Sequence, residues 1–237
     1  MKDITAKEFY DKIADKYEKE YKNKTDIAED RMIMELLDID KKSDVLDLGC
    51  GTGLFLEYCK DSHFYFGIDV SKNMINIARK KNSRDTIWIE DYRIETIHRF
   101  EKGYYNRIIS LFGSLSYVED MEKVIRIAYK KLRRDGKLFF MVYSKGYRDR
   151  VRSHNINGEK YHITNVWGYT KKELEGIIKR CGIENYKITG FRMINDRGIN
   201  IIGNEKLIKL IIEWEYKTLG KLIPDKCHFL VMDIRKE

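Results

Sequence analysis

Apolar and polar residues follow two different periods along this chain. Near the N-terminus, large apolar residues recur every three or four positions, which is the spacing of the buried face of a helix. This stripe consists of Phe9, Tyr10, Ile13, Ala14, Tyr17 and Tyr21. We therefore expect a helix over residues 5–22, and a similar pattern predicts a second helix over residues 27–37.

From residue 45 onward, short apolar runs alternate with helix-type segments. Strands are expected at residues 45–48, 64–68, 86–89, 104–111, 137–143, 186–191 and 229–234, with a turn at 134–136 before the fifth of them. Helices are expected at residues 54–60, 121–132, 170–180 and 204–219. A further helix, capped by Ser71, is expected to contain Met74, Ile75, Ile77 and Ala78. Such alternation implies right-handed crossovers, and hence a doubly wound α/β fold with a parallel sheet and helices on both faces.

Residues 144–169 interrupt this alternation with a polar segment. Asn157-Gly158 favours a tight turn, so we expect a long loop or a small hairpin. Arg148, Arg150 and Arg152 alternate and would share one side of an extended segment, where they would either face solvent or bind a carboxylate or phosphate. No repeat and no second core is evident, which indicates one domain.

Composition narrows the class of protein. Hydrophobic residues make up 43% of the chain and charged residues 35%, as in a globular protein. No apolar run approaches the roughly 20 residues that span a bilayer, and no signal-peptide core is present, so we expect a cytoplasmic protein without a membrane partner. Scattered cysteines without metal-type spacing predict buried thiols and no metal. The net charge of +8 permits an anionic partner such as nucleic acid, but the lysines are spread along the chain.

The most informative segment is Val-Leu-Asp-Leu-Gly-Cys-Gly-Thr-Gly at residues 45–53. It predicts a strand, a tight glycine turn and a helix start, a combination that holds nucleotide-like ligands. Asp69 ends the next strand, where a carboxylate can accept hydrogen bonds from both ribose hydroxyls. Asp47 would disfavour a pyrophosphate and favour a ligand that carries an amine or a cation, and Leu54 stands where the dinucleotide pattern has its third glycine.

This segment resembles the first motif of the class I S-adenosylmethionine-dependent methyltransferases. Later segments resemble further motifs of that family in the same order, at residues 67–71, 90–91, 105–120 and 132–138. Residues 9–17 and 167–174 are similar to parts of its small-molecule branch. Asn106 and Asp135 depart from the family pattern.

The resemblance implies a Rossmann-like sheet of seven strands, mostly parallel, with an antiparallel last strand between the fifth and the sixth. It implies one methyltransferase domain over residues 1–237, with cap helices at 1–40, a cofactor-binding core at 41–143, and substrate-side segments at 144–169 and 192–220. It also implies S-adenosylmethionine as cofactor, with S-adenosylhomocysteine as product. The cofactor-binding residues carried over are Tyr10, Tyr17, Asp47, Gly49, Cys50, Gly51, Asp69, Val70, Met74, Asp91, Tyr92, Ser110 and Leu111.

The acceptor of the methyl group is less defined. In-line transfer to an uncharged nucleophile depends mainly on positioning, and His154, His162 and Tyr17 are the candidates if a base is needed. A small-molecule acceptor is favoured, with an RNA or tRNA acceptor and a non-catalytic cofactor-binding protein as alternatives. A nicotinamide dehydrogenase is disfavoured by the glycine spacing. Both a monomer and a homodimer remain open.

Overall fold

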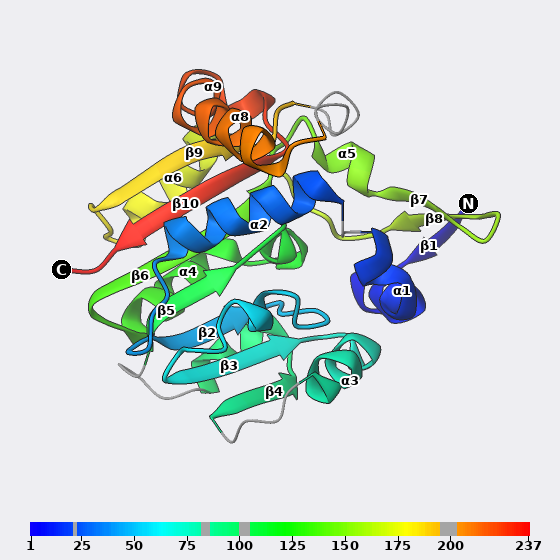
Figure 1. The fold of residues 1–237 in the computed structure, drawn as a ribbon, viewed down its shortest axis with the longest axis horizontal. Helices are drawn as coiled ribbons and strands as arrows, with labels where there is room; N and C mark the ends of the chain where they lie inside the picture. Colours follow the sequence, from blue (N-terminus) through cyan, green and yellow to red (C-terminus); the bar gives the residue numbers. More distant parts are fainter. Residues whose placement is uncertain (21–22, 82–85, 100–104, 195–202) are drawn as a thin grey trace.

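A seven-stranded sheet forms the centre of the molecule (Figure 1). The computed structural model describes residues 1–20, 23–81, 86–99, 105–194 and 203–237. The strand order is β4-β3-β2-β5-β6-β10-β9, and β10 runs antiparallel to both of its neighbours while β4, β3, β2, β5 and β6 are mutually parallel. The strands are β2 (Asp44–Leu48), β3 (Phe64–Asp69), β4 (Ile87–Asp91), β5 (Tyr105–Ser110), β6 (Leu132–Tyr143), β9 (Tyr186–Phe191) and β10 (Phe229–Arg235). The predicted doubly wound sheet with an antiparallel last strand is confirmed.

Helices cover both faces of this sheet because successive strand residues point to opposite sides. In β10, Val231 packs into the core under α2 and α8, whereas Leu230 packs into the core under α4 and α6. Figure 1 shows these two helix pairs on opposite sides of the strands, with α1 and α3 together at one end. The helices are α1 (Ala6–Glu20), α2 (Lys24–Leu37), α3 (Lys72–Lys80), α4 (Met121–Lys131), α6 (Lys171–Arg180), α8 (Glu205–Lys217) and α9 (Leu219–Leu222).

A second, three-stranded sheet joins the N-terminus to the polar segment at 144–169. It contains β1 (Lys2–Ile4), β7 (Ser153–Ile156) and β8 (Glu159–Ile163), preceded by α5 (Arg148–Val151). Asn157 and Gly158 both have positive φ and form the predicted hairpin turn. β1 was not predicted, because three residues carry no period and the strand forms only by parallel pairing with β8.

Three local predictions were wrong. Residues 54–60 form a single 3₁₀ turn, η1 (Phe55–Glu57), and Ser62 Oγ donates to the Cys59 carbonyl at 2.7 Å, where a longer helix would continue. The turn expected at 134–136 is an irregularity within β6, where Asp135 has a φ of 57°. Arg148 and Arg150 belong to the helical turn α5, which rotates each residue by about 100°, so they do not share one side of an extended segment.

Other predicted elements are confirmed with small shifts at their ends. Ser71, Thr170 and Asn204 cap α3, α6 and α8 with their side chains. The remaining short turns are η2 (Ile94–Arg99), η3 (Ser114–Tyr117) and η5 (Pro224–Lys226). Three predicted positions lie outside the described residues: Tyr21 of the first expected helix, Tyr104 of an expected strand, and residues 195–202 of the expected substrate-side segment.

Candidate functional site

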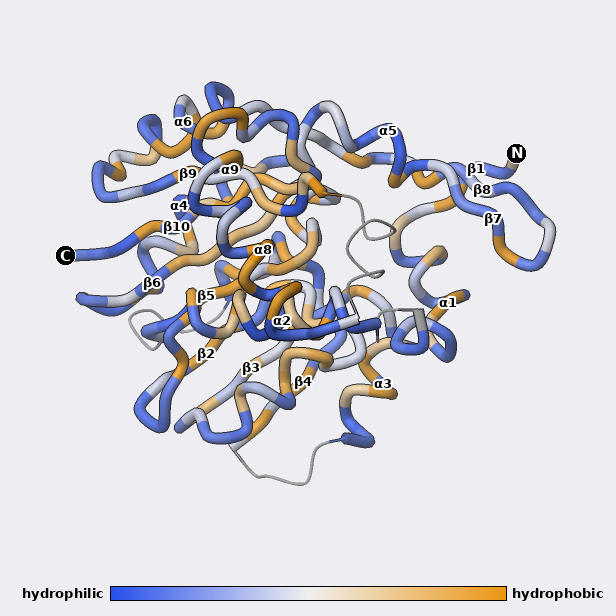
Figure 2. Tube along the Cα trace, turned by 45° about the horizontal axis from the view of Figure 1, so that its top comes forward, coloured by the Kyte–Doolittle hydropathy of each residue, from blue (hydrophilic) through white to orange (hydrophobic). Residues whose placement is uncertain are grey.

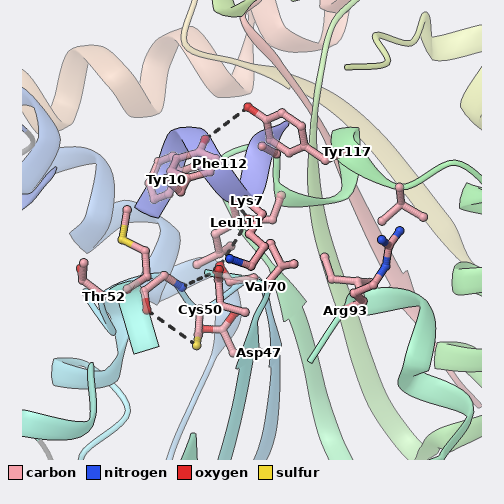
Figure 3. Close-up of a pocket in the computed structure, with 18 of the residues that line it drawn as sticks. Lys7, Tyr10, Asp47, Cys50, Thr52, Val70, Arg93, Leu111, Phe112 and Tyr117 are labelled. Atoms are coloured by element: carbon pink, nitrogen blue, oxygen red, sulfur yellow. Dashed lines mark hydrogen bonds between the residues drawn. The ribbon is translucent and has the colours of Figure 1, made fainter. Parts of the chain in front are cut away.

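A cavity of about 390 Å³ lies where the carboxyl ends of β2, β3 and β5 meet α1 (Figure 3). Ligands of open α/β sheets bind at this edge of the strands. Most of its wall comes from four parts of the chain: the glycine turn after β2, the end of β3, the turn after β5, and the N-terminal segment with α1.

The glycine turn presents backbone to the cavity. Gly49 and Gly51 have φ values of 90° and 54°, which L side chains rarely adopt. A Cβ at Gly49 would overlap the Ser114 side chain, whereas a Cβ at Gly51 would meet nothing within 4 Å. Gly49 therefore permits close packing of two turns, and Gly51 leaves a cradle of backbone open to a ligand.

Asp69, at the end of β3, holds this turn in place. Its carboxylate accepts hydrogen bonds from the backbone N–H groups of Gly51 at 3.0 Å and Ser71 at 2.9 Å. Burial raises its pKa, and these backbone donors oppose the rise. A carboxylate has about four lone-pair positions, so Asp69 retains acceptor capacity toward the cavity that it lines.

Asp47 adds a second carboxyl at the same end. It is buried and accepts a hydrogen bond from the Tyr65 hydroxyl at 2.7 Å. Burial raises the pKa of Asp47 to about 7, and the nearby charge of Asp69 contributes to the rise. Two neighbouring acids at one end of the cavity favour a ligand with positive charge there, as the sequence predicts.

Aromatic side chains form the wall on the opposite side of the cavity (Figure 3). The hydroxyl oxygens of Tyr10, from α1, and Tyr117, from η3, lie 3.2 Å apart. The ring of Tyr17 lies 6.2 Å from that of Tyr10, in an edge-on orientation. Burial raises the pKa values of Tyr10 and Tyr117 well above the usual range, so both phenols are neutral at physiological pH and can donate or accept a hydrogen bond.

The position of α1 over the cavity depends on Asp11. Its carboxylate accepts hydrogen bonds from the Ser71 hydroxyl at 2.6 Å and the Asn73 amide at 3.2 Å, at the start of α3. The Asn73 side chain in turn donates to the Asp11 carbonyl at 2.9 Å. α1 is thus attached next to Asp69, which brings Tyr10 and Tyr17 above the glycine turn.

Phe112 has a strained backbone. Its φ is 49°, a value uncommon for a bulky residue, and the next residue, Gly113, is confined because a Cβ there would lie 2.5 Å from the Tyr143 ring. The ring of Phe112 lines the cavity and lies 5.8 Å from that of Phe55 and 6.1 Å from that of Phe229. Such strain costs about 1–3 kcal/mol and clusters at functional sites.

The small sheet supplies the rim of the cavity. Because Ile4 pairs with Ile163, the residues that follow both strands lie side by side, and Thr5, Lys7, Thr164 and Asn165 line the opening. Lys7 forms an ion pair with Asp11 at 2.6 Å, and Arg93, also on the rim, forms one with Glu95 at 3.0 Å. The rim cations therefore have carboxylate partners within the chain.

The structure brings most of the predicted cofactor residues together around the cavity. Those that line it are Tyr10, Tyr17, Asp47, Gly49, Cys50, Gly51, Asp69, Val70, Met74 and Leu111. Three do not: Asp91 lies 3.7 Å from Lys72 in an ion pair, Tyr92 is exposed, and the buried Ser110 hydroxyl donates to the Leu48 carbonyl at 2.7 Å.

The three candidate bases are placed differently. Tyr17 lines the cavity, whereas His154 and His162 do not. The His154 ring packs 4.4 Å from the ring of Phe9, and its Nε2 lies 2.8 Å from the Val151 carbonyl. Both histidines belong to the hairpin of the small sheet, which contributes to the cavity only through the residues that follow it.

Sequence reasoning missed Phe112, Tyr117 and Asn165 as cavity residues. The first two belong to the segment after β5 whose motif was recognised, so the motif located them without indicating their side chains. Asn165 carried no local signal, because it reaches the rim through pairing between β1 and β8. Among the described residues there is no group of His, Cys, Asp and Glu that could hold a metal ion. No helix in that part of the chain is long and apolar enough to cross a membrane.

Comparison with known proteins agrees with this geometry. A family model described as "Methyltransferase domain" matches residues 18–188. An uncharacterized protein of Methanocaldococcus jannaschii is 28% identical over 239 residues, covering 92% of this chain and 88% of that protein. A ubiquinone biosynthesis O-methyltransferase of Coxiella burnetii is 28% identical over 123 residues, and the match spans only 51% of each chain.

The fold is shared with solved structures. The crystal structure of an S-adenosylmethionine-dependent methyltransferase from Mesorhizobium loti superposes with a TM-score of 0.63 at 18% identity, covering 88% of this chain and 98% of that one. The family match covers most of the chain, and the glycine turn, Asp69 and the strand order accord with it. The chain belongs to the methyltransferase-domain family and is a class I S-adenosylmethionine-dependent methyltransferase.

Proposed function

We propose that this enzyme transfers the methyl group to a small-molecule acceptor held between the glycine turn and the wall formed by Tyr10, Phe112 and Tyr117. The observation that carries the proposal is the cavity itself, which joins a predicted cofactor cradle to an aromatic wall within about 390 Å³. This volume lies within the usual range of small-molecule binding sites in proteins.

The residues present fit S-adenosylmethionine. The open backbone at Gly51 and the spare lone pairs of Asp69 suit a ribose, and the buried Asp47 carboxyl suits a positively charged amino group. Asp91 and Tyr92, at the end of β4, are assigned to the adenine only by the family resemblance. When bound, this cofactor supplies a methyl group already activated by a sulfonium charge.

The task of the protein is then to position the acceptor and to exclude water. α1, attached through Asp11, covers the cavity with Tyr10 and Tyr17, and the strained turn at Phe112 fixes an apolar ring beside them. Correct positioning alone contributes about 7–11 kcal/mol to such a displacement. The hydroxyls of Tyr10 and Tyr117 orient the acceptor by hydrogen bonds, and their raised pKa values keep them protonated, so they do not serve as bases.

Two features favour a small molecule over RNA. The rim cations Lys7 and Arg93 are paired with carboxylates. Two of the three arginines at 148–152 also have partners within the chain. Arg148 pairs with Asp149 at 2.9 Å, and Arg152 donates to the Val166 carbonyl at 2.7 Å. The similarity to the Coxiella ubiquinone biosynthesis O-methyltransferase also supports an acceptor of this class.

We further propose that residues 1–237 act as one domain in the cytoplasm, as a monomer or homodimer. Within it, the 144–169 segment contributes Thr164 and Asn165 to the cavity rim. The described residues of 192–220 do not line the cavity, and α8 packs beside α2 instead.

The proposal is tested by supplying the purified chain with methyl-labelled S-adenosylmethionine and separated metabolite, RNA and protein fractions of the source cell. Label in the metabolite fraction, absent with Asp69→Ala, is the expected result. Label in RNA alone would show that the acceptor is nucleic acid. Tight cofactor binding without transfer to any fraction would indicate a binding protein.

A further inference from the structure

The outer side of α8 exposes large apolar residues that the fold leaves uncovered. Leu207, Leu210 and Trp214 are 46%, 60% and 55% exposed, and their spacing of three and four places them on one side of the helix. The opposite side of α8 buries Ile208 and Ile212 in the core under α2. The helix is therefore apolar on both sides, and only one of them is explained by packing within the chain.

The exposed apolar surface continues past the end of α8. The Thr218 hydroxyl donates to the Trp214 carbonyl at 2.6 Å, and the Leu222 amide donates to the Thr218 carbonyl at 3.1 Å, so the chain turns directly into α9. Leu222 and Ile223 are 77% and 40% exposed. We call Leu207, Leu210, Trp214, Leu222 and Ile223 the α8–α9 patch.

Exposed apolar side chains are concentrated in this patch. Among the described residues nine large apolar side chains are exposed, and five of them belong to the patch. Figure 2 shows hydrophobic residues along α8, which lies with α9 at one side of the sheet. Single exposed apolar residues are ordinary, whereas a contiguous group of this kind marks an interaction site.

Most of the exposed charged residues beside the patch are lysines. Lys206, Lys217, Lys221 and Lys226 are all exposed, and of these only Lys217 forms an ion pair with a carboxylate in the described part of the chain, with Glu213 at 3.2 Å. The acids nearby are engaged in other contacts. Glu213 also pairs with Lys209, Glu205 pairs with Arg31, Glu215 is buried, and Asp225 accepts the Lys171 amide.

This charge decides between the possible partners. A second copy of the chain bound through a two-fold axis would bring two sets of the flanking lysines into one interface, and this accumulation of like charge opposes association. Nucleic acid would neutralise the lysines but would leave Trp214 and Leu222 without an apolar environment. An anionic lipid surface satisfies both, because apolar side chains enter the boundary between headgroups and acyl chains while lysines contact phosphates.

We propose that the α8–α9 patch docks this enzyme onto an anionic phospholipid bilayer. In this arrangement α8 lies along the bilayer surface and does not cross the bilayer. The net charge of +8 adds long-range attraction of the protein to the anionic lipids. The inference replaces the expectation that the chain has no membrane partner. It does not rest on the proposed acceptor, since no patch residue lines the cavity.

The test uses the full chain with unilamellar vesicles of phosphatidylcholine alone or of phosphatidylcholine with phosphatidylglycerol. We expect co-sedimentation with the anionic vesicles, little with the neutral ones, and a blue shift of tryptophan fluorescence on binding. Trp214→Ala should weaken binding by about tenfold or more and remove the shift, since it deletes the largest apolar side chain of the patch. Leu222→Glu should weaken binding similarly.

Trp88→Ala is the matched control, because Trp88 is 56% exposed but lies on β4, away from the patch. It should bind anionic vesicles like the unmodified chain. Equal binding to neutral and anionic vesicles, no binding to either, or equal losses for Trp88→Ala and Trp214→Ala would each overturn the proposal. So would a dimer in sedimentation that Trp214→Ala converts to a monomer without any effect of vesicles. Both mutated patch residues are exposed, so unaltered thermal unfolding is expected and is checked first.

Discussion

Replacing Asp69 by Ala tests the cofactor site most directly. In the structure its carboxylate accepts hydrogen bonds from the N–H groups of Gly51 and Ser71, at 3.0 and 2.9 Å, and it lines the cavity. A ribose would add hydrogen bonds to a charged acceptor, and such bonds contribute about 1.5–3 kcal/mol. This range corresponds to a loss of roughly 10- to 150-fold in affinity.

The same substitution also leaves two backbone donors, the N–H groups of Gly51 and Ser71, without their acceptor. Each unsatisfied buried donor costs about 1–3 kcal/mol unless water replaces the carboxylate, so Asp69→Ala should lower the free energy of unfolding as well. Asp69→Asn separates the two effects, because its amide oxygen can still accept from one donor of the turn while the charge is lost. We therefore expect Asp69→Asn to retain more stability than Asp69→Ala and still to bind the cofactor weakly.

Titration calorimetry with S-adenosylmethionine measures the affinity, and urea unfolding without ligand measures the stability. Asp149→Ala serves as the control, because this carboxylate is exposed and pairs with Arg148 outside the cavity. It should leave the affinity unchanged. A folded Asp69→Ala variant that binds the cofactor as tightly as the unmodified chain would refute the assignment of Asp69.

Three further predictions concern stability, each measured by urea unfolding. Gly49→Ala should lower the free energy of unfolding more than Gly51→Ala does, because a Cβ at Gly49 overlaps Ser114 whereas at Gly51 only the positive φ is unfavourable. Equal losses of stability would contradict the close packing of Gly49 against Ser114. Phe112→Gly should be more stable than Phe112→Ala by about 1–2 kcal/mol, since glycine tolerates the φ of 49°; a more stable Ala variant would exclude backbone strain. The folded state raises the pKa of Asp47 to about 7, so between about pH 4 and 7 it binds more protons than the unfolded state. The free energy of unfolding should therefore fall as pH rises through this window, and Asp47→Asn should reduce that fall; a steeper fall would reverse the assigned sign.

Local features of the sequence were enough to predict most of the elements. Ser71, Thr170 and Asn204 are good capping residues wherever they stand, because each satisfies N–H groups within its own first helical turn. Asn157-Gly158 requires only its own backbone to make the hairpin turn. The alternation of strands and helices then allowed few topologies, and the observed strand order is one of them.

The part of the cavity wall that was predicted from sequence consists of residues whose positions follow from the nearby sequence. The glycine turn with Gly49 and Gly51 comes directly after β2, and Asp69 is the last residue of β3. Because β2 and β3 are parallel neighbours, their carboxyl ends lie at the same edge of the sheet. The rest depends on contacts between distant segments. Tyr10 meets Tyr117 only because Asp11 attaches α1 to α3, and Asn165 reaches the rim only because β1 pairs with β8.

The sequence by itself therefore determined the layered sheet, the glycine turn and the acid that holds it, since each arises from residues close together in the chain. Only the tertiary structure decided that Phe112 and Tyr117 join the cavity wall, that Phe112 is held in a strained conformation, and that the outer side of α8 is left uncovered. The physical reason is that burial and strain depend on what packs against a residue, and its partners here come from remote parts of the chain.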